Sequence, residues 1–190
     1  VPVTQLRSVH RQAEASWITK NAHRVNSGYL PTFPSKGETG DCYFFEAKGP
    51  ELVLPELTRL LTRALPVKFG VHPVKDIQVF TPVNKGELGV DKLNRSLQAV
   101  LNPRRAHGSM PGQEFEWRVG DKVIQISNDY DRDVFNGDVG FVTAVRVDVG
   151  TLDVDFDGRC VSYLFAEADE ELSLAYALTI HKGQGSEYPI

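Results

Sequence analysis

The sequence is poor in cysteine and has no long hydrophobic run. Its two cysteines, Cys42 and Cys160, stand far apart among 190 residues, without a CxxC pair or a cysteine–histidine cluster. This usage argues against a disulfide framework and predicts reduced, buried thiols, as in a cytoplasmic protein. No stretch approaches the ~20 apolar residues of a transmembrane helix, so we expect no membrane partner. The start, "VPVTQLRSVHRQ", lacks an initiator Met and the apolar centre of a secretion signal, which fits a segment of a longer protein.

Several binding motifs are also missing. Neither the Walker A loop GxxxxGK[ST] nor a complete GxGxxG occurs in the chain. The five histidines show no metal-ligand spacing, so we expect no metal site. A formal charge of -4 argues against a polybasic coat, but a local basic groove needs only a few placed cations.

The apolar residues that are present predict an α/β layer. Helical spacing of apolar residues indicates helices over residues 12–28, 55–65 and 90–102, with Pro55 in a first turn. Strand-like runs occupy residues 41–47 and 76–83. The run from Leu174 to Ile180 lacks polar alternation, which indicates a strand buried on both faces of a mainly parallel sheet.

A different pattern begins near residue 110. Short strands are punctuated by "FNGDVG" and "FDGR", in which Asn-Gly and Asp-Gly are strong hairpin signals. We therefore predict a small antiparallel barrel over residues 113–165, inserted between residues 1–112 and 166–190 of an α/β domain. The acidic stretch "NDYDRDVFNGDVG" lacks the ligand order of a calcium loop and is interpreted as a solvated hairpin end.

The barrel also raises the question of a binding role. It would contain four aromatic residues that could line a peptide groove or form its core, and we favour the core. They are Trp117, Tyr130, Phe135 and Phe141.

Polar residues follow two of the predicted strands. Ligands of parallel sheets gather just past the strand carboxyl ends. Thr81, Asn84 and Lys85 could hold a phosphodiester backbone there, but from these residues alone an ordinary turn built from Pro, Asn and Gly is the better explanation. The other loop is denser and includes glycines that allow close backbone approach. Its members are Thr179, His181, Lys182, Gly183, Gln184, Gly185, Ser186 and Glu187.

Arg11 precedes the first predicted helix, where the helix dipole disfavours a cation. It is either a solvated side chain or one that points away from its helix toward a phosphate, which a guanidinium grips well.

Taken together, three segments resemble RecD-like superfamily 1 DNA helicases in order and spacing, and the resemblance covers essentially the whole chain. The segments are "LRSVHRQAEASWITKNAHRVNSG", "VFTPVNKGELGVDKLNRSLQAVLNP" and "FEWRVGDKVIQISNDYDRDVFNGDVG…LAYALTIHKGQGSE". The resemblance implies most of a second RecA-like motor lobe carrying an inserted SH3-like barrel.

The same resemblance implies roles for the polar residues. Arg11 matches an arginine that reaches the ATP γ-phosphate and would be catalytic, as an arginine finger is. Gln184, Gly185 and Glu187 match a nucleotide-linked segment. The implied contacts to single-stranded DNA are Thr81, Asn84, Lys85, Thr179, His181 and Lys182.

The implied function is that of an ATP-dependent helicase moving 5′ to 3′ on single-stranded DNA in recombination and repair. ATP and Mg²⁺ would bind with the first motor lobe, which lies outside this chain, and subunits of a repair complex would be further partners. A conjugative relaxase-helicase motor and a barrel-based docking module are the alternatives. The chain departs from the family at His10, usually aromatic, and at Gly183, often serine. The second departure removes a hydroxyl near the DNA.

Overall fold

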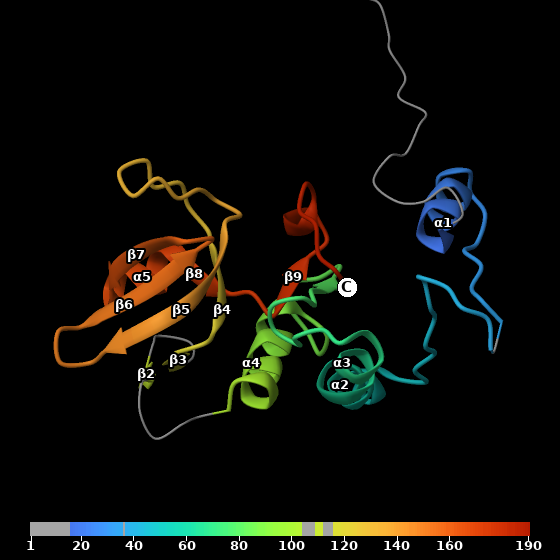
Figure 1. Cartoon of the computed structure of the whole chain (residues 1–190), viewed down its shortest axis with the longest axis horizontal. Coiled ribbons are helices and arrows are strands. Elements are labelled where there is room, and N and C mark those ends of the chain that lie inside the picture. Colours follow the sequence, from blue (N-terminus) through green and yellow to red (C-terminus); the bar gives the residue numbers. More distant parts are fainter. Residues whose placement is uncertain (1–15, 36, 104–108, 112–115) are drawn as a thin grey trace, which may run out of the picture. The chain divides into compact units, whose positions relative to one another are not determined.

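The computed structural model describes residues 16–35, 37–103, 109–111 and 116–190. They fall into two compact units, residues 1–47 and 48–190, which are considered separately (Figure 1). In the described residues, no helix combines the length and the apolar character needed to cross a membrane.

The first unit is built on helix α1 (Trp17–Asn26). Ser16 caps this helix by accepting from the backbone N–H groups of Ile18 and Thr19. Asp41 in turn accepts from the Trp17 N–H at 2.8 Å, and its hydrogen bond from Ser16 lowers the pKa of this carboxyl. The cap therefore ties the start of α1 to a residue well beyond its end.

The buried face of α1 differs from the expected apolar stripe. Ile18, Ala22 and Val25 are exposed, whereas Thr19 and Asn21 are buried. The Asn21 carboxamide exchanges two hydrogen bonds with the backbone of residue 32, at 2.7 and 2.8 Å. The loop after the helix thus covers a polar face, which apolar periodicity does not detect.

Two further expectations about this unit were wrong. Residues 41–47 form no strand, although their aromatic run had predicted one. Cys42 is only half-buried. In the second unit Cys160 is exposed on strand β7, so the predicted burial of both thiols does not hold.

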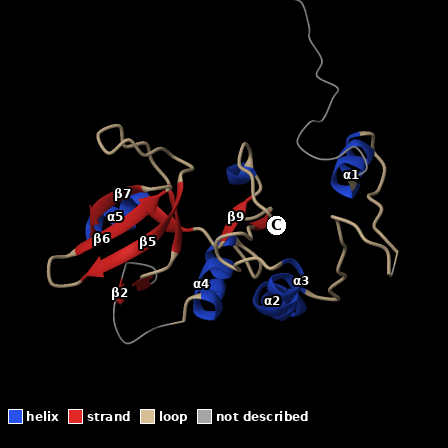
Figure 2. Cartoon of the chain, in the orientation of Figure 1, coloured by secondary structure: helices blue, strands red, loops and turns tan. Residues whose placement is uncertain are grey.

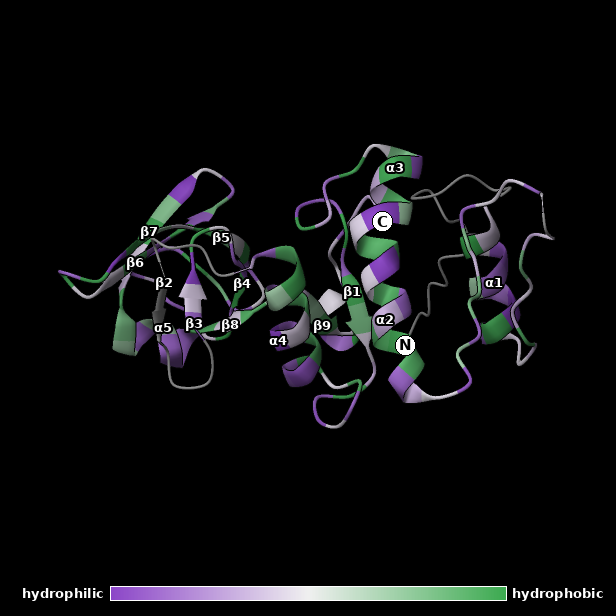
Figure 3. Ribbon diagram, turned by 90° about the horizontal axis from the view of Figure 1, so that it is seen from below, coloured by the Kyte–Doolittle hydropathy of each residue, from purple (hydrophilic) through white to green (hydrophobic). Residues whose placement is uncertain are grey.

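The second unit begins with a helical segment that starts earlier than expected. Helix α2 (Pro50–Arg59) continues through a π-helical turn (Leu60–Ala64) into α3 (Leu65–Phe69). Pro50 occupies the first turn, and Pro55 lies inside the helix, where it removes one backbone hydrogen bond. Hydrophobic and hydrophilic residues alternate along this segment (Figure 3), and Leu61 is buried in the core.

The parallel sheet predicted from the sequence is present. Strands β1 (Val79–Thr81) and β9 (Ala177–Thr179) pair in parallel. Helix α4 (Val90–Leu101) follows β1 and places Leu93 and Leu97 in the same core, as expected. Val100, also expected inside, is 40% exposed.

The antiparallel module is a five-stranded sheet in the order β7-β6-β5-β4-β8 (Figure 2). Its strands are β4 (Lys122–Gln125), β5 (Val139–Arg146), β6 (Thr151–Phe156), β7 (Arg159–Leu164) and β8 (Leu172–Leu174). Helix α5 (Phe165–Glu171) packs against it, and β2 (Ser109–Pro111) pairs with β3 (Glu116–Arg118) beside it.

The Asp-Gly signal marks a tight hairpin between β6 and β7. Asp157 and Gly158 have φ of 53° and 89°. Positive φ at both central residues is the geometry of a type I′ turn, which suits the twist of paired strands.

The apolar run from Leu174 to Ile180 is divided between the two sheets, not one strand as predicted. β8 pairs with β4 of the antiparallel sheet, and β9 pairs with β1. Between them the chain bends at Ala175 and Tyr176, where the Ala175 N–H still donates to the Lys122 carbonyl and Asn94 pairs other backbone groups. Asn94 donates to the carbonyls of Leu174 (2.8 Å) and Ala177 (3.0 Å) and accepts from the Ala177 N–H (2.7 Å).

Asp121, at the start of β4, is the centre of a buried polar cluster. Its carboxylate is fully buried and accepts from Gln98 Nε2 (2.7 Å), Asn102 Nδ2 (2.8 Å), the Tyr176 hydroxyl (2.8 Å) and the Arg118 N–H (2.8 Å). Burial raises the pKa of Asp121, and the hydrogen bonds act against this increase. One carboxylate therefore joins α4, the antiparallel module and the bend before β9.

Asp121→Ala should destabilise this unit by roughly 3–5 kcal/mol, because it leaves several buried donors without an acceptor. Urea unfolding of the variant gives this number. Asp148→Ala is the matched control on an exposed turn and should change the free energy of unfolding by less than about 0.5 kcal/mol. Similar small losses for both variants would contradict the role given to Asp121.

Lys122 is buried beside this cluster. Its ammonium donates to the Ile77 carbonyl (3.2 Å) and lies 5.2 Å from the centre of the Tyr188 ring. Burial lowers the pKa of Lys122 from 10.5 to about 8, opposed by the charge of Asp76. The charged form is thus unfavourable in the folded state.

Because the folded protein loses this proton before the unfolded chain does, the free energy of unfolding should rise as pH increases from about 8 toward 10.5. Between pH 7 and pH 9.5 the wild type should gain roughly 2 kcal/mol relative to Lys122→Met, which lacks the titrating group. Urea unfolding at the two pH values measures the difference. A constant difference would show that Lys122 is not held in a charge-disfavouring environment.

Candidate nucleic-acid interface

The structure brings the two predicted DNA-binding loops to one edge of the parallel sheet. Thr81 and Thr179 are direct partners in the β1–β9 register. Neighbouring strands lie about 4.8 Å apart, so the loops of residues 82–89 and 180–187 leave the sheet side by side.

In the first loop, Thr81 is an internal support. It is only 4% exposed, and its hydroxyl donates to the Leu88 carbonyl at 2.7 Å. A Cβ on Gly89 would overlap the backbone of Asn84, so the loop folds closely on itself. Asn84 and Lys85 are exposed at its surface. The groups available to a phosphodiester backbone here are therefore Asn84 and Lys85.

The second loop contains a 3-10 turn (His181–Gly183). Thr179 Oγ1 accepts from the Lys182 N–H at 3.3 Å and so supports this turn. The side chains of His181 and Lys182 reach solvent. Neighbouring protein displaces part of the water around the Lys182 ammonium, which lowers the pKa of this group. An anion beside Lys182 would favour its charged form.

Phe80 joins the two loops and was missed by the sequence analysis. It lies on β1 opposite Leu178, and its ring packs so closely on Gly183 that a Cβ there would overlap it. Tyr188 meets the ring edge-on, with centroids 5.8 Å apart. The available signal was strand alternation, which turns Phe80 to the opposite face from Thr81.

The residues predicted to contact nucleotide are only partly described. Gln184, Gly185 and Glu187 lie in the second loop, where Gln184 and Glu187 are exposed and Gly185 has a φ of 86°. Arg11 lies outside the described residues. Because the sequence contains no GxxxxGK[ST] loop, the residues present do not form a triphosphate cradle by themselves.

The four aromatic residues of the antiparallel module divide into two pairs. Trp117 is 1% exposed and donates from Nε1 to Asp169 at 2.8 Å, and Phe141 is half-buried. Trp117 lies in the core of the module, as expected. Phe141 packs instead against the core that contains Leu97 of α4. Tyr130 and Phe135 are instead 77% and 38% exposed, and they form an edge-to-face pair with centroids 5.8 Å apart.

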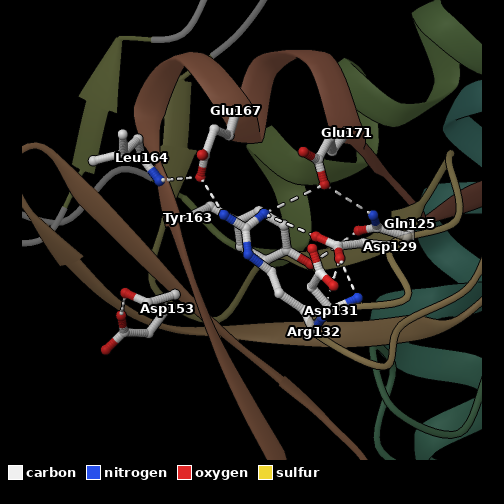
Figure 4. Close-up of polar contacts among 10 residues, drawn as sticks. Gln125, Asp129, Asp131, Arg132, Asp153, Tyr163, Leu164, Glu167 and Glu171 are labelled. Atoms are coloured by element: carbon white, nitrogen blue, oxygen red, sulfur yellow. Dashed lines mark hydrogen bonds and ion pairs between the residues drawn. The ribbon is translucent and has the colours of Figure 1, made fainter.

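Arg132 anchors the loop that carries this exposed pair (Figure 4). Its guanidinium forms ion pairs with Glu167 (2.6 Å), Asp129 (3.2 Å) and Glu171 (3.5 Å), and it lies 5.0 Å from the Tyr163 ring centre. Of the acidic stretch compared with a calcium loop, Asp129 thus pairs with Arg132, and Asp133 pairs with Arg159 at 2.6 Å. No group of acidic, histidine or cysteine residues suited to a metal occurs in the part of the chain that is described.

Comparison with known proteins identifies the family. Residues 93–156 match the family described as the ATP-dependent RecD-like DNA helicase SH3 domain. The chain is 36% identical to the ATP-dependent RecD2 DNA helicase of Deinococcus radiodurans over 98% of its length, and 28% identical to the RecBCD enzyme subunit RecD of Mycolicibacterium smegmatis over 72%. It spans 24% of each of these relatives.

The fold agrees with this assignment. The fold is similar to the crystal structure of the Pif1 helicase from Bacteroides in complex with ADP-AlF3 and single-stranded DNA. The match covers 97% of this chain and 44% of the Pif1 chain, with a TM-score of 0.54 and 19% sequence identity. The α/β part is accordingly RecA-like, and the antiparallel module is SH3-like. The chain belongs to the RecD-like family of superfamily 1 DNA helicases.

Proposed function

We propose that the protein containing this chain is an ATP-dependent helicase that moves 5′ to 3′ along single-stranded DNA in the cytoplasm, in recombination and repair. Residues 1–112 belong to its second motor lobe, and the inserted barrel predicted over residues 113–165 extends through α5 and β8 to residue 174. The motor lobe resumes after β8. A first lobe outside this chain binds ATP with Mg²⁺. Subunits of a repair complex are further partners.

The observation that carries this proposal is the pairing of Thr81 with Thr179. It sets two polar loops side by side at the carboxyl edge of a parallel sheet, where such sheets bind ligands. Asn84, Lys85, His181 and Lys182 supply exposed donors that suit phosphate oxygens. Contacts of this kind are independent of base sequence and weaken with salt.

The nucleotide lies at the other end of the second loop in this proposal. Gln184, Gly185 and Glu187 link the DNA-gripping residues to it, and Arg11 reaches its γ-phosphate across the boundary between lobes. A guanidinium in that position stabilises the charge that develops on the transferred phosphoryl group. Closure of the lobes on ATP would then shift both loops along the strand.

A second candidate role concerns the barrel. The exposed Tyr130–Phe135 pair, on a loop that Arg132 holds in place, favours a docking function for this module. Loss of a bound partner from the full-length protein on Tyr130→Ala, with helicase activity unchanged, would support it.

Arg11→Ala in the full-length protein should lower ATP hydrolysis at least about 10³-fold, as removal of an arginine finger does, with single-stranded DNA affinity retained. Steady-state ATPase assays and DNA-binding titrations measure the two effects. Arg63→Ala, an exposed arginine of the π-helical turn, is the control. Near-normal hydrolysis by Arg11→Ala would refute the assigned role.

Thr81→Val should loosen the first loop while keeping the side-chain volume, because it removes the hydrogen bond to Leu88. A net loss of about 1 kcal/mol predicts roughly fivefold weaker single-stranded DNA binding. Thr81→Ser retains the hydroxyl and should bind normally. Equal affinity of all three proteins would show that the loop needs no such support.

A further inference from the structure

Phe80 has features that its packing role leaves unexplained. Phe80 is 41% exposed, although the neighbouring Thr81 is 4% exposed and its cross-strand partner Leu178 is 2% exposed. It stands one residue before the end of β1, at the root of both polar loops. A large apolar ring at this position leaves part of its surface in water.

The ring is also fixed in orientation. One side lies against the backbone of Gly183, where any side chain would overlap it, and the edge of Tyr188 contacts it at a centroid distance of 5.8 Å. The absence of a side chain at Gly183 leaves the space that the Phe80 ring occupies.

The surroundings suit a nucleic acid strand. Lys85, His181 and Lys182 are exposed in the two loops, and the nearby carboxylate of Glu87 is ion-paired with Lys92 at 2.5 Å. Cationic groups that follow a phosphate backbone, combined with aromatic faces for the bases, are typical of sequence-independent single-strand binding.

We propose that Phe80 is a stacking platform for one base of the bound single strand, with Gly183 as the residue that allows its placement. The inference rests on the proposed function and adds a base contact to the phosphate contacts of the two loops. The ligand is any nucleobase, because every base offers an aromatic face.

The test compares two strands in the full-length protein. One is a fluorescein-labelled oligo-dT, and the other is an oligonucleotide of equal length made of abasic residues. Phe80→Leu keeps an apolar side chain against Gly183 but removes the aromatic face. It should weaken oligo-dT binding at least about fivefold and leave the abasic strand unaffected, whereas Phe80→Trp should bind both as the wild type does.

Two further variants sharpen the result. Gly183→Ser should displace the ring and reproduce the selective loss for oligo-dT. Phe69→Leu changes a phenylalanine of comparable exposure (47%) on α3 and should change neither affinity.

Other outcomes overturn the proposal. Equal losses on both strands would make Phe80 only a support of the loops, and no loss on either would remove it from the interface. Failure of the wild type to bind either strand would contradict the proposed function itself. These results are distinguishable, because the wild-type titration is independent of the variants.

Discussion

The carboxamide of Asn94 on α4 is the contact on which the arrangement of the second unit depends. Where the chain leaves the antiparallel sheet and enters the parallel pair, its backbone groups lose regular strand partners. Asn94 supplies both a donor and an acceptor there, to Leu174 and Ala177. If these buried backbone groups were left without partners, the free energy of unfolding would fall by several kcal/mol. Gln78 Nε2 adds a hydrogen bond to the Ala175 carbonyl at 3.1 Å.

These hydrogen bonds explain how the SH3-like module and the polar loops form one body. β8 and β9 are consecutive pieces of one run, so a displacement of the module is transmitted to Thr179 and the loop after it. Asp121 adds a second connection between the module and α4, and Lys122 donates to the chain just before β1. The module is therefore held as a rigid neighbour of the proposed DNA-facing edge.

Much of this fold could be predicted from local patterns, and the exceptions have physical causes. α4 and the Asp157–Gly158 turn follow from periodicity and from a backbone preference. The division of the run Leu174–Ile180 between two sheets could not be predicted, because a sequence that is apolar throughout fits a buried strand of either sheet. The prediction that Pro55 lies in a first turn was wrong, because the helix begins about one turn earlier, at Pro50. Phe80 was overlooked because strand alternation places it on the face opposite Thr81 but does not tell whether that face is exposed.

Native-state hydrogen exchange tests the central claim most directly. If α4 joins both sheets into one body, the amides of Leu97 in α4, Val142 in the antiparallel sheet and Ala177 in β9 should open with a common free energy. Asn94→Ala should lower all three by the same amount. The account would be contradicted if the Val142 amide opened with a different free energy from those of Leu97 and Ala177, and if Asn94→Ala left that value unchanged. The module would then be only loosely attached to the motor lobe.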